Sequence, residues 1–204
     1  MFDIKVIDKA VLVSIKPEWV CEILNGKKTI EIRKNFPNLK PPFKVYIYCT
    51  SGSKKLNYLR TDSKKTRNYW LDNKAFGYNV ASCNGKVVAE FICDTILEFE
   101  RDEYGANCYD IDDDSFEAAC ITLMSDYWDY GKGKTLYGWH ISDLKIYSEP
   151  AYLNDFAQTK VINTKKNGNN NFIEKLLNTK SIEVKHLNRP PQSWCYVNKR
   201  RGLV

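Results

Sequence analysis

The sequence predicts an α+β domain in which short strands outnumber helices, and three observations support this. The chain opens with an apolar strand-like run, a short amphipathic helix and a second strand, all within residues 10–33. The length of 204 residues suits one domain, residues 1–204, that buries most of its apolar surface. Runs typical of strands then recur to the end of the chain, at residues 44–50, 86–93, 136–141, 144–147, 181–187 and 194–197.

The first elements have clear start and stop signals. Pro17 fits the first turn of a helix, because that turn tolerates a missing backbone N–H. One face of this helix is apolar and includes Trp19, which we expect to pack in the core rather than against a ligand. Gly26 closes the helix, since glycine readily adopts a positive φ.

Two parts of the chain interrupt the strand pattern. Residues 51–84 are interpreted as a partly helical insertion that is rich in basic and aromatic residues. This insertion ends at Asn84-Gly85, a pair that predicts a tight turn and a hairpin into the following strand. Residues 157–180 read as a variable, partly flexible segment, because they contain the run Lys-Lys-Asn-Gly-Asn-Asn-Asn.

Residues 26–33 bring together the charged and polar side chains that are best suited to bind a ligand. On a strand, Thr29, Glu31 and Arg33 share one face and two isoleucines share the other, because strand side chains alternate. With Lys28, this face offers an ammonium, a carboxylate and a guanidinium, which together can hold one small polar ligand in a fixed orientation. The alternative is an exposed strand whose charges form ordinary surface ion pairs.

The same stretch reads Gly-x-Lys-x-x-Glu-x-Arg, a pattern that resembles the signature of the ASCH domain, a family of the PUA-like superfamily. The resemblance implies a small mixed β-barrel with flanking helices. It also implies an RNA- or nucleotide-binding module whose ligand lies in the barrel cleft, against the signature strand. The opening that begins with residues 11–19 resembles that of ASCH proteins in general, and four further segments resemble a bacterial or phage subgroup of the family, namely residues 45–49, 86–91, 136–141 and 189–196.

Further candidate ligand-binding residues lie on other strands. Glu90 is a carboxylate in the middle of an apolar strand, so it needs a partner, a cavity or solvent. In a PUA-like barrel we expect Glu90 near the cleft, with Lys28 or Arg33 as its counter-charge. The alternative is an exposed position on a half-buried sheet. Trp194 or Tyr46 offers a ring on which a base can stack.

Charge is segregated along the chain, whose formal net charge is +6. Residues 94–117 are strongly acidic, and we expect these acids to precede and cap a helix at residues 115–123. Residues 51–70 are basic with interleaved rings, which predicts contact with the backbone of a single-stranded nucleic acid. A solvated loop anchored by its rings has the same composition. The basic residues of this insertion are Lys54, Lys55, Arg60, Lys64, Lys65 and Arg67.

Nothing in the composition indicates a cofactor, a metal site or a membrane partner. The seven cysteines form an odd set without a Cys-x-x-Cys pair and read as reduced core residues. His140 reads as a structural residue of a strand. An Asp-x-Asp-x-Asp run at residues 110–114 lacks the glycine and glutamate that a calcium loop needs. Without a signal-peptide-like or membrane-spanning run, we expect a cytoplasmic protein, whose oligomeric state the sequence does not indicate.

Three functions fit these features. The first is a module that binds RNA or a modified nucleotide, with DNA as the alternative nucleic acid. The second is a hydrolase, because one branch of the ASCH family removes the acetyl group of N4-acetylcytidine with a lysine and a threonine on the signature strand. This sequence has Lys28 at the lysine position but Glu31 at the threonine position, so Lys28 and Glu31 would form the acid–base pair. The third and least favoured is a metal-dependent ribonuclease.

Overall fold

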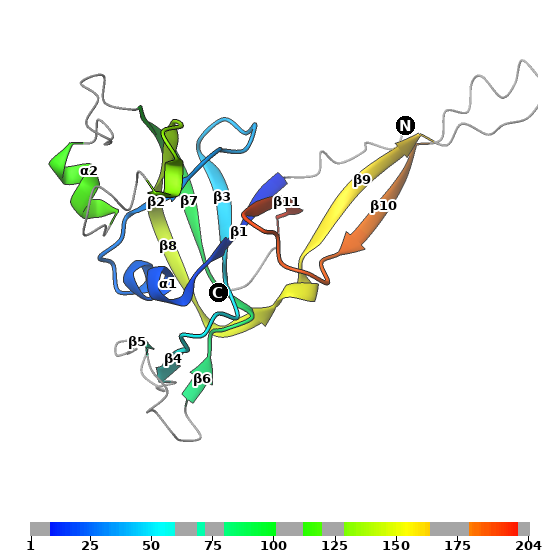
Figure 1. Ribbon diagram of the computed structural model, residues 1–204. Coiled ribbons are helices and arrows are strands. Elements are labelled where there is room, and N and C mark those ends of the chain that lie inside the picture. Colours follow the sequence, from blue (N-terminus) through cyan, green and yellow to red (C-terminus); the bar gives the residue numbers. More distant parts are fainter. Residues whose placement is uncertain are drawn as a thin grey trace, which may run out of the picture.

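A computed structural model describes residues 9–59, 69–71, 80–100, 112–119, 129–163 and 180–199 (Figure 1). Strands predominate in these parts and helices are few, which confirms the α+β prediction. The elements in chain order are β1 (Lys9–Ile15), α1 (Pro17–Leu24), β2 (Ile30–Arg33), β3 (Phe43–Cys49), β4 (Leu56–Leu59), β5 (Tyr69–Leu71), β6 (Val80–Ser82), β7 (Lys86–Phe99), α2 (Asp113–Ala118), β8 (Leu136–Tyr152), the 3₁₀ helix η1 (Leu153–Asp155), β9 (Ala157–Asn163), β10 (Lys180–His186) and β11 (Trp194–Asn198).

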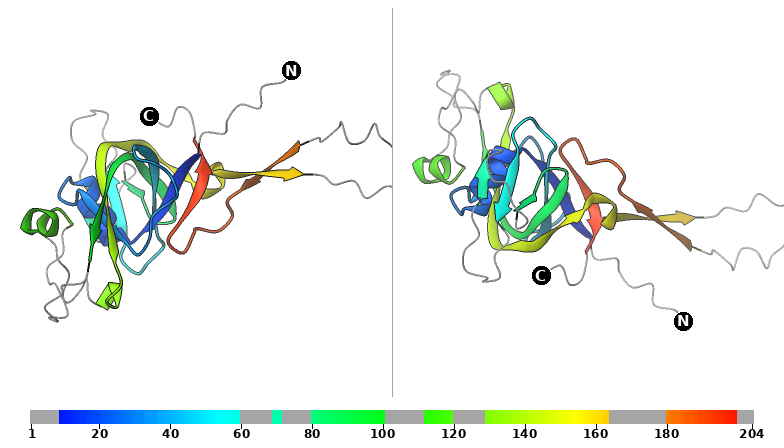
Figure 2. Two further views of the ribbon diagram at one scale, coloured as in Figure 1. Left: turned by 90° about the horizontal axis from the view of Figure 1, so that it is seen from above. Right: turned by 90° about the horizontal axis from the view of Figure 1, so that it is seen from below.

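The central sheet has six strands in the order β11-β1-β3-β7-β8-β2. β1 and β3 run parallel, and the other neighbours pair antiparallel. Figure 2 shows this sheet curling around a central core, with β2 and β11 as its edge strands. No backbone pairing joins these two edges among the described residues, so the expected barrel is observed as a curled sheet and its closure is not confirmed.

The largest apolar cluster joins side chains of β1, β3, β7 and β8 with the apolar face of α1. Trp19 packs against this cluster, as predicted, and is partly buried. The helix signals are also confirmed, because Pro17 opens α1 and Gly26 follows its end with a φ of +75°. The first strand, helix and second strand therefore form as the sequence predicts.

A second apolar cluster covers the opposite face of β1 and β3 and contains Tyr46, Tyr147 and Phe156. Next to it, β9 and β10 leave the body as a two-stranded antiparallel arm, which projects away from the sheet in Figures 1 and 2. The segment 157–180, expected to be variable, thus begins and ends in strands. Its residues 164–179 lie outside the described residues.

The regular elements among the described residues of the insertion 51–84 are strands, and the helical part that the sequence predicts would fall in residues 60–68 or 72–79, outside the described residues. β4, β5 and β6 form a small sheet of their own, in the order β5-β4-β6. Asn84 and Gly85 make the predicted turn, and Gly85 has a φ of +77°. The predicted hairpin is wrong, because β6 pairs with β4 and not with β7. The side-chain amide of Asn84 instead binds the segment around the start of β4: its oxygen accepts from the Leu56 backbone N–H at 2.8 Å, and its nitrogen donates to the Lys54 carbonyl at 2.9 Å.

The acidic region ends in a capped helix, as predicted, although α2 begins two residues earlier than expected. The Asp112 side chain accepts from the Ser115 backbone N–H at 2.8 Å, and two further acids occupy the first turn. The strand-like runs at residues 136–141 and 144–147 belong to one continuous strand, β8. At the turn expected between them, the strand continues with an irregular register against β7 and a positive φ of 46° at Asp143.

Most of the described cysteines lie in the core. Cys21, Cys49, Cys83 and Cys93 are buried and unbridged, as predicted, whereas Cys108 and Cys120 fall outside the described residues. Burial is the main reason why the pKa of Cys83 and that of Cys93 rise to about 12. These thiols therefore stay protonated and act as small apolar core groups.

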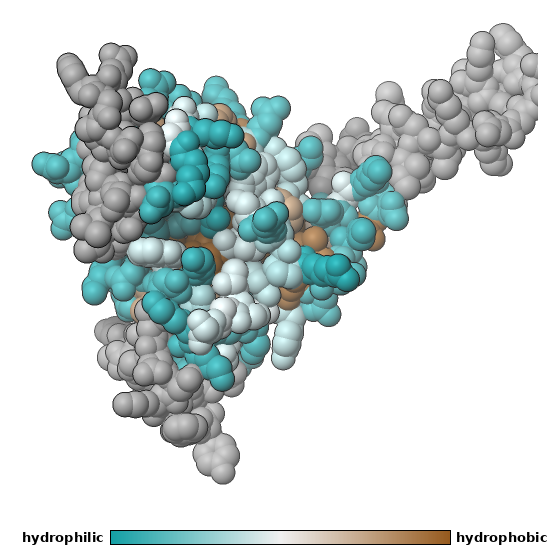
Figure 3. Space-filling model, in the orientation of Figure 1, coloured by the Kyte–Doolittle hydropathy of each residue, from teal (hydrophilic) through white to brown (hydrophobic). Residues whose placement is uncertain are grey.

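The face of the molecule seen in Figure 1 is largely polar. Figure 3 shows a face that is mostly hydrophilic, with hydrophobic residues exposed only in small patches. None of the helices in the described ranges has the length and apolarity to cross a membrane.

Gly138 in β8 leads to a stability prediction, because neighbouring side chains leave no room for a Cβ atom there. A Cβ at this position would lie 2.7 Å from Phe99 Cε2 and 2.9 Å from Ile30 Cγ2. Gly138→Ala is expected to lower the free energy of unfolding in urea by about 1–3 kcal/mol through overpacking. Gly52→Ala is the control, because its Cβ would meet no atom closer than 3.7 Å. Equal losses in both variants would contradict the crowding argument.

Candidate functional site

β2 has two faces of opposite character, as the alternation predicts. Ile30 and Ile32 pack with Phe99 and Leu136 in an apolar cluster on one side. Glu31 and Arg33 point to the other side, since adjacent strand residues alternate. Their cross-strand partners in β8, which share their face, are Trp139 for Glu31 and Tyr137 for Arg33.

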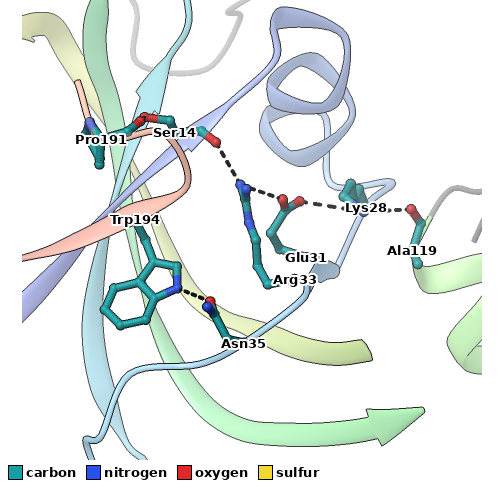
Figure 4. A network of polar contacts seen from close by, with 8 residues as sticks. All are labelled: Ser14, Lys28, Glu31, Arg33, Asn35, Ala119, Pro191 and Trp194. Atoms are coloured by element: carbon teal, nitrogen blue, oxygen red, sulfur yellow. Dashed lines mark hydrogen bonds and ion pairs between the residues drawn. The ribbon is translucent and has the colours of Figure 1, made fainter. Parts of the chain in front are cut away.

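The three charged residues of the signature are buried together. Lys28 is 4 % exposed, Glu31 5 % and Arg33 8 %. Glu31 lies between the two cations, with Oε1 2.9 Å from an Arg33 guanidinium nitrogen and Oε2 3.7 Å from Lys28 Nζ (Figure 4). This burial excludes the alternative of ordinary surface ion pairs, because exposed pairs keep their water and these do not.

Lys28 is anchored by two helices. Its ammonium donates to the Ala119 carbonyl at 2.7 Å and lies 5.5 Å from the centre of the Trp19 ring. The backbone N–H of Thr29 donates to the Ala118 carbonyl at 2.8 Å. Both carbonyls belong to the end of α2, where the helix leaves acceptors without intrahelical partners and favours positive charge. The lysine and the strand start are thus fixed between α1 and α2.

Arg33 connects the other end of the signature to β1. One of its terminal nitrogens donates to the Ser14 carbonyl at 2.8 Å, and the Ser14 hydroxyl donates to the Pro191 carbonyl at 2.7 Å. Figure 4 shows these contacts as one chain running from Ala119 to Pro191. β2 is one edge of the curled sheet, and β1 is the strand next to the other edge. The Arg33 side chain therefore links the β2 edge to β1.

Two buried donors at this site have no hydrogen-bond partner among the described residues. They are Nε of Arg33 and the indole Nε1 of Trp139. Both belong to the inward face of the β2–β8 pair, since Trp139 is the cross-strand partner of Glu31. An unpaired buried N–H is costly and uncommon, so the two donors mark a place where an acceptor is expected.

Tyr130, which the sequence analysis did not single out, lies beside this site. Burial is the main cause of a raised pKa of its hydroxyl; the Arg33 guanidinium and a hydrogen bond to it oppose this rise, and the Glu31 carboxylate adds to it. Tyr130 is 39 % exposed, and Lys34 Nζ lies 4.8 Å from the centre of its ring. Tyr130 is therefore partly exposed and also close to the buried charges. No local pattern in the sequence predicts this position.

Glu90 lies elsewhere, and the expected counter-charge is wrong. Its carboxylate pairs with Lys44 of β3 and accepts from the Tyr147 hydroxyl at 2.9 Å, not from Lys28 or Arg33. Both partners are on neighbouring strands of the sheet, on the face of the second apolar cluster. Glu90 is itself buried, so the alternative of an exposed position is also wrong.

The two expected stacking rings are not equivalent. Tyr46 is fully buried and packs edge-on against Phe156 at 4.9 Å, so it offers no face to a ligand. Trp194 is partly buried, and its indole N–H donates to Asn35 Oδ1 at 2.7 Å (Figure 4). Its ring lies 6.1 Å from that of Trp139, which places it close to the inward face that carries Glu31.

The basic insertion is only partly described. Lys54 and Lys55 are exposed, as a contact with a nucleic-acid backbone requires. The remaining residues of this group, namely Arg60, Lys64, Lys65 and Arg67, lie outside the described residues.

His140 and the acids form no further chemical site in the described ranges. His140 Nδ1 lies 2.6 Å from Asp94 Oδ1, and this hydrogen bond is the main reason why the pKa of Asp94 is lowered. That contact fits the structural role expected for His140. In the parts of the chain that the structure covers, no three histidine, cysteine or acidic side chains are grouped as a metal ion would need.

The chain is similar in structure to ASCH proteins. The crystal structure of ASCH from Zymomonas mobilis is 16 % identical over 94 % of this chain and 88 % of that chain, with a TM-score of 0.48. Two mutants of the same protein give 14 % and 15 % identity, with TM-scores of 0.48 and 0.49. They cover 94 % and 96 % of this chain and 91 % of their own. Neither a family model nor a curated protein sequence matches the chain.

The position of Glu31 between two buried cations predicts its effect on stability. Glu31→Ala is expected to lower the free energy of unfolding by roughly 3–5 kcal/mol, because Lys28 and Arg33 lose the charge that compensates their burial. Urea denaturation followed by circular dichroism measures this loss. The matched control is Glu22→Ala, which removes a carboxylate 3.7 Å from the exposed Lys27 ammonium and should cost at most about 1 kcal/mol. A Glu31→Ala loss no larger than that of Glu22→Ala would contradict the structural role.

Proposed function

We propose that this protein is an ASCH-type module that binds RNA or a modified nucleotide at the Lys28, Glu31 and Arg33 site. The observation that carries the proposal is the buried row of these three charges. Lysine and glutamate side chains are almost never fully buried unless they are paired. Here the row also includes an arginine donor without a partner among the described residues, which a purely structural ion pair does not require.

The chemistry of the row suits part of a nucleotide. Glu31 supplies acceptor oxygens for a base amino or imino group, while Arg33 Nε and Trp139 Nε1 supply donors for carbonyl or ring-nitrogen acceptors. Two cations against one carboxylate leave a positive balance that favours a ligand rich in acceptors or negatively charged. Such a combination of donors and an acceptor reads the edge of a single unpaired base.

The first test is binding of a short RNA that carries one N4-acetylcytidine. Glu31→Gln and Lys28→Met are expected to weaken binding by roughly 10- to 150-fold, as loss of a hydrogen bond to a charged group does. Fluorescence anisotropy measures the affinity, and urea denaturation confirms that each variant is folded. Lys27→Ala is the matched control, because its ammonium is adjacent in sequence but exposed and paired with Glu22. Equal affinity of all three variants and the unaltered chain would contradict the proposal.

A second candidate function is a hydrolase acting on an acylated nucleoside, and the closeness of Lys28 and Glu31 favours it. Their charged groups lie 3.7 Å apart in a buried site, so a proton can pass through one water or a substrate atom between them. Mass spectrometry of the same incubated RNA distinguishes the two functions. Loss of the acetyl mass that disappears in Glu31→Gln, while some binding remains, identifies the hydrolase. A broken strand identifies a ribonuclease, and an intact RNA leaves the binding module.

The basic insertion is proposed to contact the phosphates of the bound strand. Replacement of Lys54, Lys55, Lys64 and Lys65 by glutamine is expected to weaken RNA binding at low salt. The slope of log affinity against log salt concentration should become shallower by about 0.7 for each phosphate that a lysine no longer neutralises, because fewer counterions are released on binding. Anisotropy titrations at several salt concentrations measure this slope. An unchanged slope would exclude the insertion from the interface.

A further inference from the structure

Two of the large apolar or aromatic side chains exposed in the described ranges lie near the Arg33 end of β2. Phe36 is 41 % exposed and Tyr130 is 39 % exposed. The other two, Tyr152 and Val184, lie on different elements, at the end of β8 and in β10. Phe36 and Tyr130 thus leave ring surface in solvent next to the buried charged site.

Each ring is positioned by a contact with β2 or its cross-strand partner. The Phe36 ring packs edge-on against Tyr137, with ring centres 4.7 Å apart, and Tyr137 is the partner of Arg33 across the β2–β8 pair. The Tyr130 ring lies 4.8 Å from the Nζ of Lys34, the residue after Arg33, and the Arg33 guanidinium opposes the rise in the pKa of the Tyr130 hydroxyl. One ring is therefore placed by the strand partner of Arg33, and the other lies beside the lysine that follows Arg33.

We propose that Phe36 and Tyr130, together with Lys34, form a stacking platform for unpaired bases that flank the nucleotide bound at Glu31 and Arg33. This inference rests on the proposed function and specifies its ligand as a single strand rather than a free nucleoside. Rings beside a cation are the combination on which bases of a single strand stack, since every base has a π-face and each nucleotide adds a phosphate. In a duplex the bases are stacked on their neighbours, so their faces are not available to the rings.

This platform replaces the rings that the sequence suggested. Tyr46 is enclosed by the second apolar cluster, and the indole N–H of Trp194 is held by Asn35. Phe36 and Tyr130 instead keep a large part of their surface in solvent, so a base can replace water on them without disturbing the core.

The test compares single-stranded and duplex RNA with variants of these rings. The probes are a fluorescein-labelled 12-nucleotide oligouridylate and the same strand annealed to oligoadenylate, titrated by anisotropy. Tyr130→Ala and Phe36→Ala are each expected to weaken binding of the single strand by roughly 5- to 150-fold, the effect of losing one stacked base. Binding of the duplex should not respond to either change.

Two further variants control for fold and for loss of a surface ring in general. Tyr130→Phe removes the hydroxyl but keeps the ring, so it should bind the single strand nearly as well as the unaltered chain, even if Tyr130→Ala fails to fold. Tyr152→Ala removes a tyrosine that is 63 % exposed and lies under Lys86 at 5.4 Å, at the other end of β8, and it should have no effect. This pair of residues matches Tyr130 and Lys34 in chemistry but not in place.

The outcomes separate this inference from the function on which it rests. If the unaltered chain binds the oligouridylate and the ring variants bind it equally well, the platform is overturned and the nucleotide site stands. The same conclusion follows if Tyr152→Ala weakens binding as much as Tyr130→Ala. If the chain binds the N4-acetylcytidine RNA but not the oligouridylate, the flanking-base platform fails while the nucleotide site stands. If it binds neither RNA, both the platform and the proposed function fail.

Discussion

The placement of Glu31 between Lys28 and Arg33 is the constraint on which the site depends. Each cation continues beyond the carboxylate to a different part of the chain, Lys28 to the end of α2 and Arg33 to β1. The sheet has no backbone pairing between its two edges among the described residues, and the buried row of side chains links the β2 edge to β1, the strand next to the opposite edge. Buried ions contribute little net stability but strongly disfavour arrangements in which one partner is missing. The row of Lys28, Glu31 and Arg33 therefore fixes the positions of α2 and β1 relative to β2.

This constraint explains why the segment 26–33 is both structural and chemical. A four-residue strand at a sheet edge is weak on its own, and β2 is held by Ile30 and Ile32 on one face and by charges on the other. Groups fixed by packing on one side are positioned on the other without further cost in conformational freedom. The same rigidity leaves Arg33 Nε and Trp139 Nε1 in place with no acceptor among the described residues. Under the proposed function, the site is therefore preorganised for its ligand rather than shaped by it.

The sequence predicts which residues share a face but not what covers that face. The two faces of β2 and the helix signals at Pro17 and Gly26 depend only on local geometry, and these predictions are confirmed. The partner of Glu90 and the burial of Tyr46 depend on Lys44 and Phe156, which are distant along the chain or on a neighbouring strand. For the same reason no pattern in the sequence singles out Tyr130. The strands of the insertion were not predicted because their contacts join residues distant in sequence, such as Asn84, whose side-chain oxygen accepts from the Leu56 backbone N–H.

In the proposed complex, the ligand would be recognised both by buried charges and by solvent-exposed lysines. In the buried row, water is excluded and hydrogen bonds to charged groups are strong and little affected by salt. At Lys54 and Lys55, which are exposed, attraction to phosphates is screened and depends on counterion release. Discrimination between ligands therefore belongs to Glu31, Arg33 and Trp139, whereas general affinity for a strand belongs to the surface lysines. The rings of Phe36 and Tyr130 are partly exposed and lie beside the buried row. Because they stack only on bases whose faces are free, they would make the protein bind single strands more tightly than duplexes.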